Sequence, residues 1–528
     1  MSRSPSVSES SRRDANAIRD AASTLRIVLL TPARRFIANR AGLGWQIPLG
    51  LVLLGGPLLD AGHRVELVDN DALGLSDAAL AARLASDPPD VLMIGHTGST
   101  AAHPVAARTA QALRAALPAA TIVYGGPYPS YAARHVLATC PAFDVIVHGE
   151  GEATAVELAA AIAADPRALG RVAGITWRAP GGIERTAERA PIEDLDAWRP
   201  GWELVDWDRY AMFGFGRAAG FQFSRGCTLS CTYCGQWSFW RRWRHRSPEN
   251  VADELQRLAQ RHGVRIVWFA DENFPADREA ARATLEAIAA RDLGLSLNLN
   301  MTAADVLRDA DLLPLYKRAG VDNIVMGVES LEDDTVARIG KDNPFEVARQ
   351  AVRLARAHGI VGLVNVIYGL RGESVATLAR TARRVFALDP DVLNAMYLTP
   401  HHWTVEGRDL DPADVIQPDQ GLWTYRNQVL AAPGLKPWQL FAGVKLTEAL
   451  FHLRPRALWR MAAGGDARYR RVLRAYLATG VRVAWAELVE FARDTRFAPR
   501  GGVAAAPGFP ARARRVVPIR PGPQEPDR

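Results

Sequence analysis

Cysteine is scarce in this chain, which has four among its 528 residues. So few cysteines exclude a disulfide framework and indicate a reducing compartment. Long apolar runs are also missing: no stretch could span a bilayer, and the N-terminus has no apolar signal core. We therefore expect a cytoplasmic protein without a transmembrane segment, with peripheral contact to a membrane surface left open.

A strong excess of charge of one sign is absent as well. Lys and Arg number 64 and Asp and Glu 57, so the formal net charge of +7 does not by itself indicate a nucleic-acid partner. The length suggests several domains, and 48% hydrophobic residues is enough to form their cores. The two ends, residues 1–24 and 499–528, have the Ser/Arg-rich or Pro/Gly/Arg-rich composition of disordered tails.

Residues 25–165 alternate short β-branched runs with helical patterns. The predicted strands are 26–30, 64–68, 91–95, 121–124 and 144–147, and the predicted helices are 46–61, 77–85, 102–116 and 130–139. This alternation predicts a parallel sheet covered on both faces, in the doubly wound, flavodoxin-like (Rossmann-type) arrangement. Such sheets bind ligands at the carboxyl ends of their strands.

Small and polar residues gather at those predicted strand ends. They are Thr97, Ser99, Gly125, Gly126, Gly149 and Glu150. Glycines there let a large flat ligand or a phosphate approach the backbone. A sheet that has lost its ligand and only supports the next domain is the alternative, because a fold alone does not fix a function.

A second series of strand–helix units follows a bridge at 166–215, which contains a predicted hairpin and a Trp-rich segment. In residues 216–405 the predicted strands are 220–224, 265–270, 296–300, 323–327, 362–367 and 392–397, and the predicted helices are 248–261, 277–291, 309–319, 332–338, 345–358 and 375–387. Six such units make a partial (βα)6 TIM-type barrel, with its site at the strand ends. Residues 406–498 are predicted to be a helical C-terminal domain, all-helical over 411–495, that covers the open barrel.

Three of the four cysteines, Cys227, Cys231 and Cys234, lie together with the spacing C-x3-C-x2-C. Each iron of a four-iron cubane is usually held by a thiolate, so three cysteines leave one iron open to a small molecule. A zinc site with His245 or His262 as fourth ligand is the alternative. It is disfavoured because zinc sites usually combine C-x2-C with a second, distant pair, which the sequence lacks.

The cysteine spacing, with Tyr233 directly before the last cysteine, resembles the radical S-adenosylmethionine (SAM) superfamily. The resemblance implies a [4Fe–4S] cluster whose open iron binds SAM, and a deoxyadenosyl radical that abstracts hydrogen from the substrate. It also implies SAM contacts at later strand ends, where an acidic side chain suits the ammonium group. These residues are Glu272 and then Asp271 for the ammonium, Asn300 and Thr302 for the ribose, and Glu329 for the ribose or the methionine end.

Together with the cysteine motif, residues 25–165 resemble the cobalamin-binding domain that precedes the radical SAM domain in one large subclass. The resemblance implies cobalamin as a further cofactor, bound at the glycine-rich strand ends. The D-x-H-x-x-G motif that gives a histidine to cobalt in some cobalamin proteins is missing, and His96 and His103 lack that context. We therefore expect bound cobalamin to have no axial histidine.

The aromatic and basic run at 236–248 narrows the resemblance to the anaerobic magnesium-protoporphyrin IX monomethyl ester oxidative cyclases of bacteriochlorophyll synthesis. This resemblance covers most of the chain. It implies closure of the fifth ring by oxidation of the ring-C methyl propionate with oxygen from water, and an external electron donor such as flavodoxin or ferredoxin. Trp237, Phe239 and Trp240 can stack on a porphyrin-like substrate, while Arg241, Arg242 or Arg244 can pair with a propionate.

Other functions share parts of this pattern. A cobalamin-dependent radical SAM C-methyltransferase, acting on a tetrapyrrole or another hydrophobic substrate, needs the same three cofactors. An RNA-modifying methylthiotransferase would also use basic and aromatic residues, but no RNA-binding module is present in the sequence. An iron–sulfur scaffold or redox sensor would need no SAM-binding strand ends. The segments before Gln46 and around His401 match the cyclases less well, so a paralogue with another substrate also fits.

Overall fold

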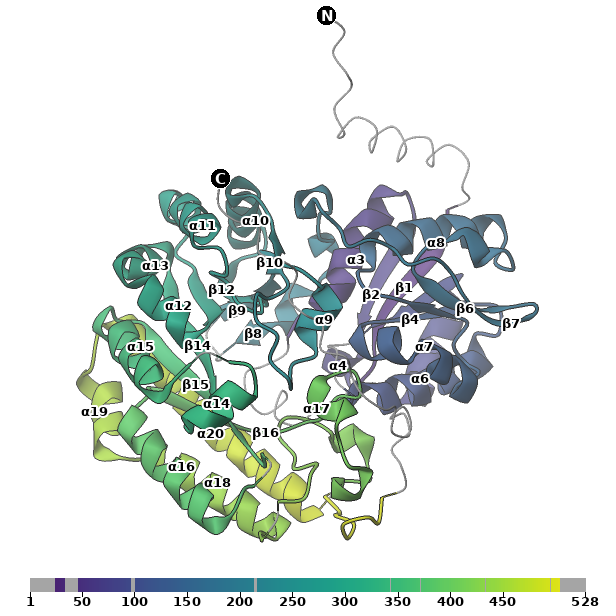
Figure 1. Ribbon diagram of the computed structural model, residues 1–528. Coiled ribbons are helices and arrows are strands. Elements are labelled where there is room, and N and C mark those ends of the chain that lie inside the picture. Colours follow the sequence, from purple (N-terminus) through teal and green to yellow (C-terminus); the bar gives the residue numbers. More distant parts are fainter. Residues whose placement is uncertain are drawn as a thin grey trace, which may run out of the picture.

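The computed structural model describes residues 24–33, 46–95, 100–212, 216–341, 343–370, 372–432, 434–493 and 495–503. Two α/β lobes lie side by side, and the C-terminal helices belong to the second lobe (Figure 1). Most of the two predicted tails, residues 1–23 and 504–528, lies outside the described residues. The predicted fold class, a flavodoxin-like domain, a partial barrel and a helical C-terminal region, is confirmed.

The first lobe is built on a sheet of seven strands in the order β2-β1-β3-β4-β5-β6-β7. Its strands are β1 (Arg26–Thr31), β2 (Arg64–Asp69), β3 (Val91–Ile94), β4 (Thr121–Gly125), β5 (Val145–Val147), β6 (Ile175–Ala179) and β7 (Gly182–Arg185). The first five strands are parallel and have the flavodoxin-like order. β6 and β7 form the predicted hairpin and extend the sheet in antiparallel fashion.

Helices cover both faces of this sheet because both faces of its strands are apolar. The helices are α3 (Leu49–Asp60), α5 (Asp77–Ala85), α6 (Ala102–Ala116), α7 (Pro127–Thr139) and α8 (Glu152–Ala164). Ile27 and Leu29 on one face pack with α3 and α8, whereas Val28 and Leu30 on the other pack with α5, α6 and α7. The carboxyl ends of the parallel strands are left uncovered by helices and face the second lobe.

The second lobe contains an open barrel of six parallel strands with one antiparallel strand at its edge, in the order β16-β15-β14-β13-β12-β9-β8. Its strands are β8 (Ala211–Met212), β9 (Gly216–Phe221), β12 (Val264–Phe269), β13 (Ser296–Met301), β14 (Val321–Glu329), β15 (Val361–Tyr368) and β16 (Val392–Tyr397). The first barrel strand lies earlier than the predicted 220–224. The reason is that Ser224–Arg225 (β10) turns away and pairs with Arg244–His245 (β11).

Helices cover the convex face of the barrel. They are α10 (Pro248–Arg261), α11 (Arg278–Arg291), α12 (Ala303–Arg308), α13 (Leu313–Ala319), α14 (Asp333–Arg338), α15 (Phe345–Ala357) and α16 (Val375–Leu388). The bounds of α10 match the prediction because its local signals are strong. Ser247 Oγ accepts a hydrogen bond from Asn250 N at 3.3 Å, and Pro248 occupies the first turn.

The C-terminal region ends in α18 (Pro437–His452), α19 (Pro455–Ala463) and α20 (Ala467–Arg493). Tyr469 and Val472 of α20 pack on Val325 and Leu363, which alternate with side chains that face the outer helices. This helix therefore lies on the concave side of the barrel. Among the described residues, no helix is both long enough and apolar enough to cross a membrane.

The prediction that 411–495 is all-helical is wrong before Pro437. This stretch contains short 3-10 turns at Pro412–Asp414 and Gln420–Leu422 and one isolated bridge. The carboxylates of Asp411 and Asp419 accept hydrogen bonds from backbone N–H groups two residues later, which favours turns over helix.

Candidate active site

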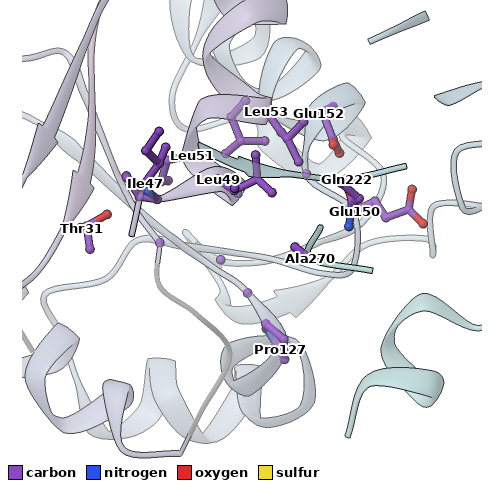
Figure 2. Close-up of a pocket in the computed structure, with 18 of the residues that line it drawn as sticks. Thr31, Ile47, Leu49, Leu51, Leu53, Pro127, Glu150, Glu152, Gln222 and Ala270 are labelled. Atoms are coloured by element: carbon purple, nitrogen blue, oxygen red, sulfur yellow. The ribbon is translucent and has the colours of Figure 1, made fainter. Parts of the chain in front are cut away.

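A cavity of about 540 Å³ lies between the two lobes, where the strand ends of both sheets meet. The first lobe contributes Thr31, Gly95, Gly125, Gly126, Gly149 and Glu150, and the second contributes Gly220, Gln222, Arg225, Phe239, Trp240, Trp268 and Glu272. Figure 2 shows Glu150 and Gln222 close together on one side of the cavity, which is also lined by Leu49, Leu51 and Leu53 of α3. The cavity is therefore mainly apolar, with a few charged groups at one side.

The first-lobe wall of this cavity fits a large group held against the backbone. A Cβ atom at Gly95 would lie 2.7 Å from Leu51 Cδ2, and one at Gly151 would lie 2.9 Å from Leu54 Cδ2, so a side chain at either position would require a leucine side chain of α3 to shift. Gly126 and Gly149 have φ of 117° and 64°, which favours glycine. Thr31 Oγ1 is buried and has no hydrogen-bond partner in the described part of the chain, as expected of a group that contacts a ligand.

Four of the predicted cobalamin residues, Gly125, Gly126, Gly149 and Glu150, line this cavity. Thr97 and Ser99 lie outside the described residues, as does His96. His103 is buried in a stack with Tyr128, at a ring distance of 4.3 Å, and is not among the cavity residues.

Glu150 lies in a buried ion-pair network that joins the lobes. Arg225 binds Glu150 Oε2 at 2.9 Å and also pairs with Glu152, while Arg244 binds Glu150 Oε1 at 2.6 Å. These side chains are almost fully buried, so the two acids hold the arginines firmly in place. The carboxylate of Glu150 thus positions Arg225, whose guanidinium also lies over the Trp240 ring.

The three clustered cysteines follow β10 on one loop, ahead of α9 (Gln236–Trp240). Backbone N–H groups point at two of the sulfurs: Leu229 N lies 3.4 Å from Cys227 Sγ, and Gln236 N lies 3.5 Å from Cys234 Sγ. Burial raises the pKa of each thiol, that of Cys234 to about 12. A positively charged metal cluster would be needed to hold these groups as thiolates.

The zinc alternative loses its proposed fourth ligands. In the described part of the chain neither histidine is grouped with the cysteines: His262 stacks on Trp207 at 4.8 Å, and His245 packs on Trp243 at 5.0 Å. Within the described ranges, no three His, Cys, Asp or Glu side chains are grouped as ligands of a single metal ion. Three thiols spread over a loop suit the larger spacing of a cluster better than one small ion.

The two adjacent acids after β12 have different surroundings. Asp271 accepts hydrogen bonds from Phe223 N at 3.2 Å and from Ser224 N at 2.5 Å, so it braces the start of the cysteine loop. Glu272 lines the cavity, and burial raises its pKa to about 7. Its charge also raises the pKa of Cys227 and Cys234, although burial is the larger cause for both thiols. Glu272 is therefore the acid placed between the cavity and the thiols.

Glu329 occupies an unusual position at the end of β14. Its φ is 65°, rare for a residue with a side chain. Lys341 Nζ binds Glu329 Oε1 at 2.7 Å, while Glu329 Oε2 is buried without a hydrogen-bond partner among the described residues. Strained backbone and an unpaired buried oxygen both indicate a ligand-binding residue.

Lys341 was not predicted from the sequence. It lies beside Tyr233 in the cysteine loop, with Nζ 3.4 Å from the Tyr233 hydroxyl. It also lowers the pKa of Cys231, against the larger effect of burial. It follows α14 rather than a strand, so no spacing in the sequence marks it.

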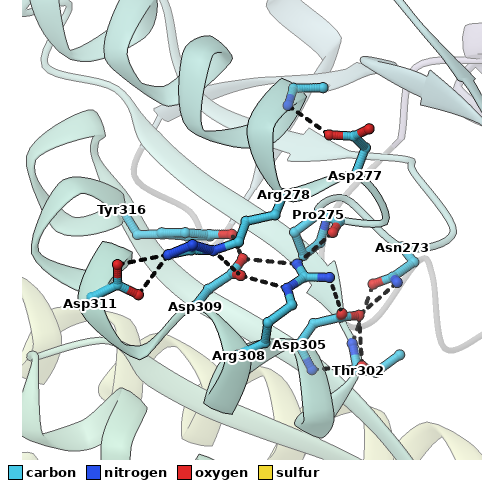
Figure 3. A network of polar contacts seen from close by, with 11 residues as sticks. Asn273, Pro275, Asp277, Arg278, Thr302, Asp305, Arg308, Asp309, Asp311 and Tyr316 are labelled. Carbon is cyan, nitrogen blue, oxygen red and sulfur yellow. Dashed lines mark hydrogen bonds and ion pairs between the residues drawn. The ribbon is translucent and has the colours of Figure 1, made fainter. Parts of the chain in front are cut away.

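Asn300 and Thr302 have structural partners outside the cavity. Asn300 donates to the Asp271 carbonyl at 2.9 Å, and Thr302 Oγ1 donates to Asp305 at 2.7 Å as it begins α12. Figure 3 shows the polar network that continues from Thr302 and Asp305 through Arg308 to Asp309. The network fixes the loop after β12, which also carries Glu272.

The aromatic-basic run lies at the boundary of the two lobes. Trp237 donates to the Cys231 carbonyl at 3.2 Å, while Phe239 and Trp240 line the cavity. Of the three predicted arginines, Arg244 is buried against Glu150 and is occupied by the protein itself. Arg241 lines a second cavity of about 250 Å³ that shares Phe239 and Glu150 with the first.

His401 is a further cavity residue that the sequence did not mark as part of the site. Its Nδ1 lies 2.8 Å from Thr100 Oγ1, although 301 residues separate the two in sequence. Its ring stacks on Trp403 at 4.7 Å, and Trp403 stacks on Tyr131 of the first lobe. The segment after β16 thus packs against the first lobe and joins it to the barrel.

Comparison with known proteins agrees with this geometry. The B12 binding domain profile matches residues 38–159, and the radical SAM superfamily profile matches residues 221–385. These two matches confirm the three predicted cofactors, which are a [4Fe–4S] cluster, SAM and cobalamin.

Individual proteins are similar over most of the chain. The anaerobic magnesium-protoporphyrin IX monomethyl ester cyclase of Synechocystis sp. is 40% identical over 88% of this chain and 93% of its own length. The cyclase of the same name from Cereibacter sphaeroides is 30% identical, over 87% of this chain and 76% of its own length.

Among solved structures, the radical SAM methyltransferase TsrM from Kitasatospora setae superposes with a TM-score of 0.66 at 16% identity. The match covers 88% of this chain and all of TsrM, and it shows a shared fold. Given the two cyclases above, this chain belongs to the family of anaerobic magnesium-protoporphyrin IX monomethyl ester cyclases, with a B12-binding domain followed by a radical SAM domain.

Proposed function

We propose that this chain is a radical SAM oxidative cyclase that closes the fifth ring of a magnesium porphyrin monomethyl ester. The observation that carries the proposal is the cavity between the lobes. It brings the glycine-rich strand ends of the B12-binding domain together with Glu272 and the aromatic residues next to the cysteine loop. Cofactors and a large flat substrate would therefore meet in one largely apolar space.

On this proposal, Cys227, Cys231 and Cys234 hold three irons of the cluster, and Glu272 binds the ammonium of SAM. The Glu329–Lys341 pair lies beside Tyr233 of the cysteine loop, where the unpaired oxygen of Glu329 suits a hydroxyl and the Lys341 cation suits a carboxylate. When bound, the cluster and SAM supply a carbon radical that abstracts hydrogen, and cobalamin supplies electron-transfer chemistry. The protein orients the reactants and keeps water away from them.

The substrate side of the site is proposed from Phe239, Trp240 and Arg241. The two rings line the main cavity, where they can stack on a macrocycle. Arg241 lines the smaller cavity, and its exposed partner Glu188 lies 3.2 Å away. Such an exposed ion pair is weak, so the guanidinium can exchange its partner for a substrate carboxylate.

Mass analysis of the product tests the function. The anaerobically reconstituted enzyme, supplied with the porphyrin ester, SAM and a reductant in water labelled with heavy oxygen, should give a product with one labelled oxygen and four fewer hydrogens. This balance follows from oxidising one methylene to a ketone and joining the next carbon to the ring. A product that instead gains one methyl group would identify a C-methyltransferase and overturn the proposal.

Two further parts of the proposal concern the surroundings of the enzyme. A cytoplasmic location suits clustered thiols that must stay reduced. An external one-electron donor, such as flavodoxin or ferredoxin, would supply the cluster. These remain predictions.

Removing the charge of Glu272 should weaken SAM binding. We expect Glu272→Gln to lose about 1.5–3 kcal/mol, the usual value of a hydrogen bond to a charged group, with the cluster intact. Equilibrium dialysis of SAM against the cluster-loaded protein measures the change.

Glu373→Gln is a matched control, because Glu373 is another buried acid at a barrel strand end, but it accepts a hydrogen bond from Gly369 N at 3.0 Å. Its SAM affinity should equal that of the wild type. Equal affinity in Glu272→Gln would instead shift the ammonium site towards Glu329.

A further inference from the structure

The C-terminal helices present an unusual amount of apolar surface. Trp438, Trp459 and Trp485 have exposed fractions of 58%, 64% and 68%, and Leu446, Leu450 and Leu488 are also exposed. Nine of the thirteen large apolar side chains that are exposed in the described part of the chain lie between residues 438 and 488. Exposed apolar residues concentrated in this way usually mark an interaction site rather than ordinary surface.

The helices that carry these residues are neighbours in the fold. α18 and α20 lie side by side, because Phe441 stacks on Phe491 at 4.1 Å and Lys445 Nζ binds Glu487 Oε2 at 2.5 Å. On α18 the exposed large apolar residues Trp438, Leu446 and Leu450 are spaced eight and four residues apart. On α20 Val481, Trp485 and Leu488 are spaced four and three apart, so each helix turns one apolar stripe outward. α19 packs against both helices and adds Trp459 (Figure 1). We call the outward side of α18, α19 and α20 the C-terminal face.

The exposed charges around this face are mainly positive. Residues 437–493 contain ten Lys or Arg and four Asp or Glu. The acids have partners within the protein: Glu448 and Glu487 pair with Lys445, Glu490 accepts from Asn427, and Asp466 lies near Lys317. Arg454, Arg460 and Arg468 are also paired, with Asp389 or Asp322. The exposed charges on the three helices are mainly arginines, including Arg456, Arg474 and Arg482.

We propose that the C-terminal face docks onto a bilayer that contains anionic lipids. Tryptophan favours the boundary between headgroups and acyl chains, and arginine can lay its apolar stem on that surface while its charge meets a phosphate. A second copy of the chain is a poorer occupant, since a twofold dimer would place this cationic face against itself. The protein would then lie on the membrane surface rather than span it.

Sedimentation with lipid vesicles tests this proposal on the full-length, cluster-loaded protein. We expect binding to vesicles of phosphatidylcholine with phosphatidylglycerol, at least tenfold weaker binding to phosphatidylcholine alone, and release by salt. Replacing Trp438, Trp459 and Trp485 together by Ser should reduce binding to the anionic vesicles at least tenfold without loss of cluster absorbance. Val375→Ser is the matched control: Val375 is 61% exposed but lies on α16, outside the face, and its variant should bind as the wild type does.

A second variant separates charge from apolar contact. Arg456→Glu combined with Arg482→Glu should weaken binding to the anionic vesicles at least tenfold and leave the weak binding to neutral vesicles unchanged. Wild-type protein that does not sediment with anionic vesicles would overturn the proposal, as would a triple tryptophan variant that binds like the wild type. A wild-type dimer that becomes a monomer in the triple variant would show that a second copy covers the face instead.

Discussion

Anaerobically purified Cys231→Ala should contain no [4Fe–4S] cluster, whereas the wild type should contain one per chain. Cys231 is buried, and its sulfur lies beside the cysteine loop's own backbone and Gly340. With one thiolate removed, two irons of the cluster would have no protein ligand, and two remaining thiolates do not hold a cubane. Iron and sulfide analysis, together with the absorbance of the cluster, measures the loss, and Cys227→Ala and Cys234→Ala should behave in the same way.

Cys140→Ala is the matched control for this experiment. Cys140 is buried in the apolar core between the sheet of the first lobe and its helices, far from the loop in sequence and in fold. A small apolar substitution there should leave the cluster in place at a modest cost in stability. A full complement of cluster in Cys231→Ala would mean that the ligand set is not the one proposed.

The sequence predicts the position of the site well because its signals are local. Each signal is contained in a few consecutive residues: the three spaced cysteines, the acid pair at the end of β12, and the glycines at each strand end. Parallel strands bring their carboxyl ends to one edge of their own sheet, so alternating elements are enough to place Gly125 near Gly149 in the first lobe and Glu272 at a strand end of the second. That these two edges meet in one cavity depends on how the lobes pack.

The partners of these residues could not be predicted in the same way. Arg244 is one of the three arginines that the sequence offers for a substrate propionate, but it is buried against Glu150, which lies 94 residues earlier. Lys341, which follows α14 in the chain, contacts Tyr233 of the cysteine loop. His401, which follows the last barrel strand, contacts Thr100 of the first lobe. Such pairings depend on how the two lobes pack, and neither periodicity nor motif spacing contains that information.

Local signals also explain the error in the C-terminal region. Aromatic residues recur at helical spacing from Trp423 onward, yet Trp423 sits in a turn with its Nε1 bonded to the Gln417 carbonyl at 2.9 Å. In this stretch, aspartate carboxylates accept hydrogen bonds from backbone N–H groups and favour turns, although the apolar residues have helical spacing. α18 begins at Pro437, and no aspartate lies within its bounds, Pro437–His452.

Replacing Gly126 by Trp should abolish cobalamin binding and leave the [4Fe–4S] cluster in place. Gly126 lines the cavity at the start of α7, directly after β4, where an indole would fill the space proposed for the corrin. The cluster lies on a loop of the other lobe and does not depend on this residue. Cobalamin content after anaerobic reconstitution should fall from one per chain to near zero, with iron content unchanged.

Backbone strain must be separated from loss of space in this variant, because Gly126 has a φ of 117° that a side chain tolerates poorly. Gly125→Trp makes the separation: Gly125 also lines the cavity but has an ordinary φ, and its Cβ would meet nothing closer than Val147 Cβ at 3.8 Å. Gly62→Trp is the converse control, with a φ of 88° and open space around it at the end of α3. If cobalamin binds in the cavity, Gly125→Trp should lose it and Gly62→Trp should retain it. Stoichiometric cobalamin in Gly125→Trp would place the corrin elsewhere, and the glycine-rich strand ends would then serve only to bring the two lobes together.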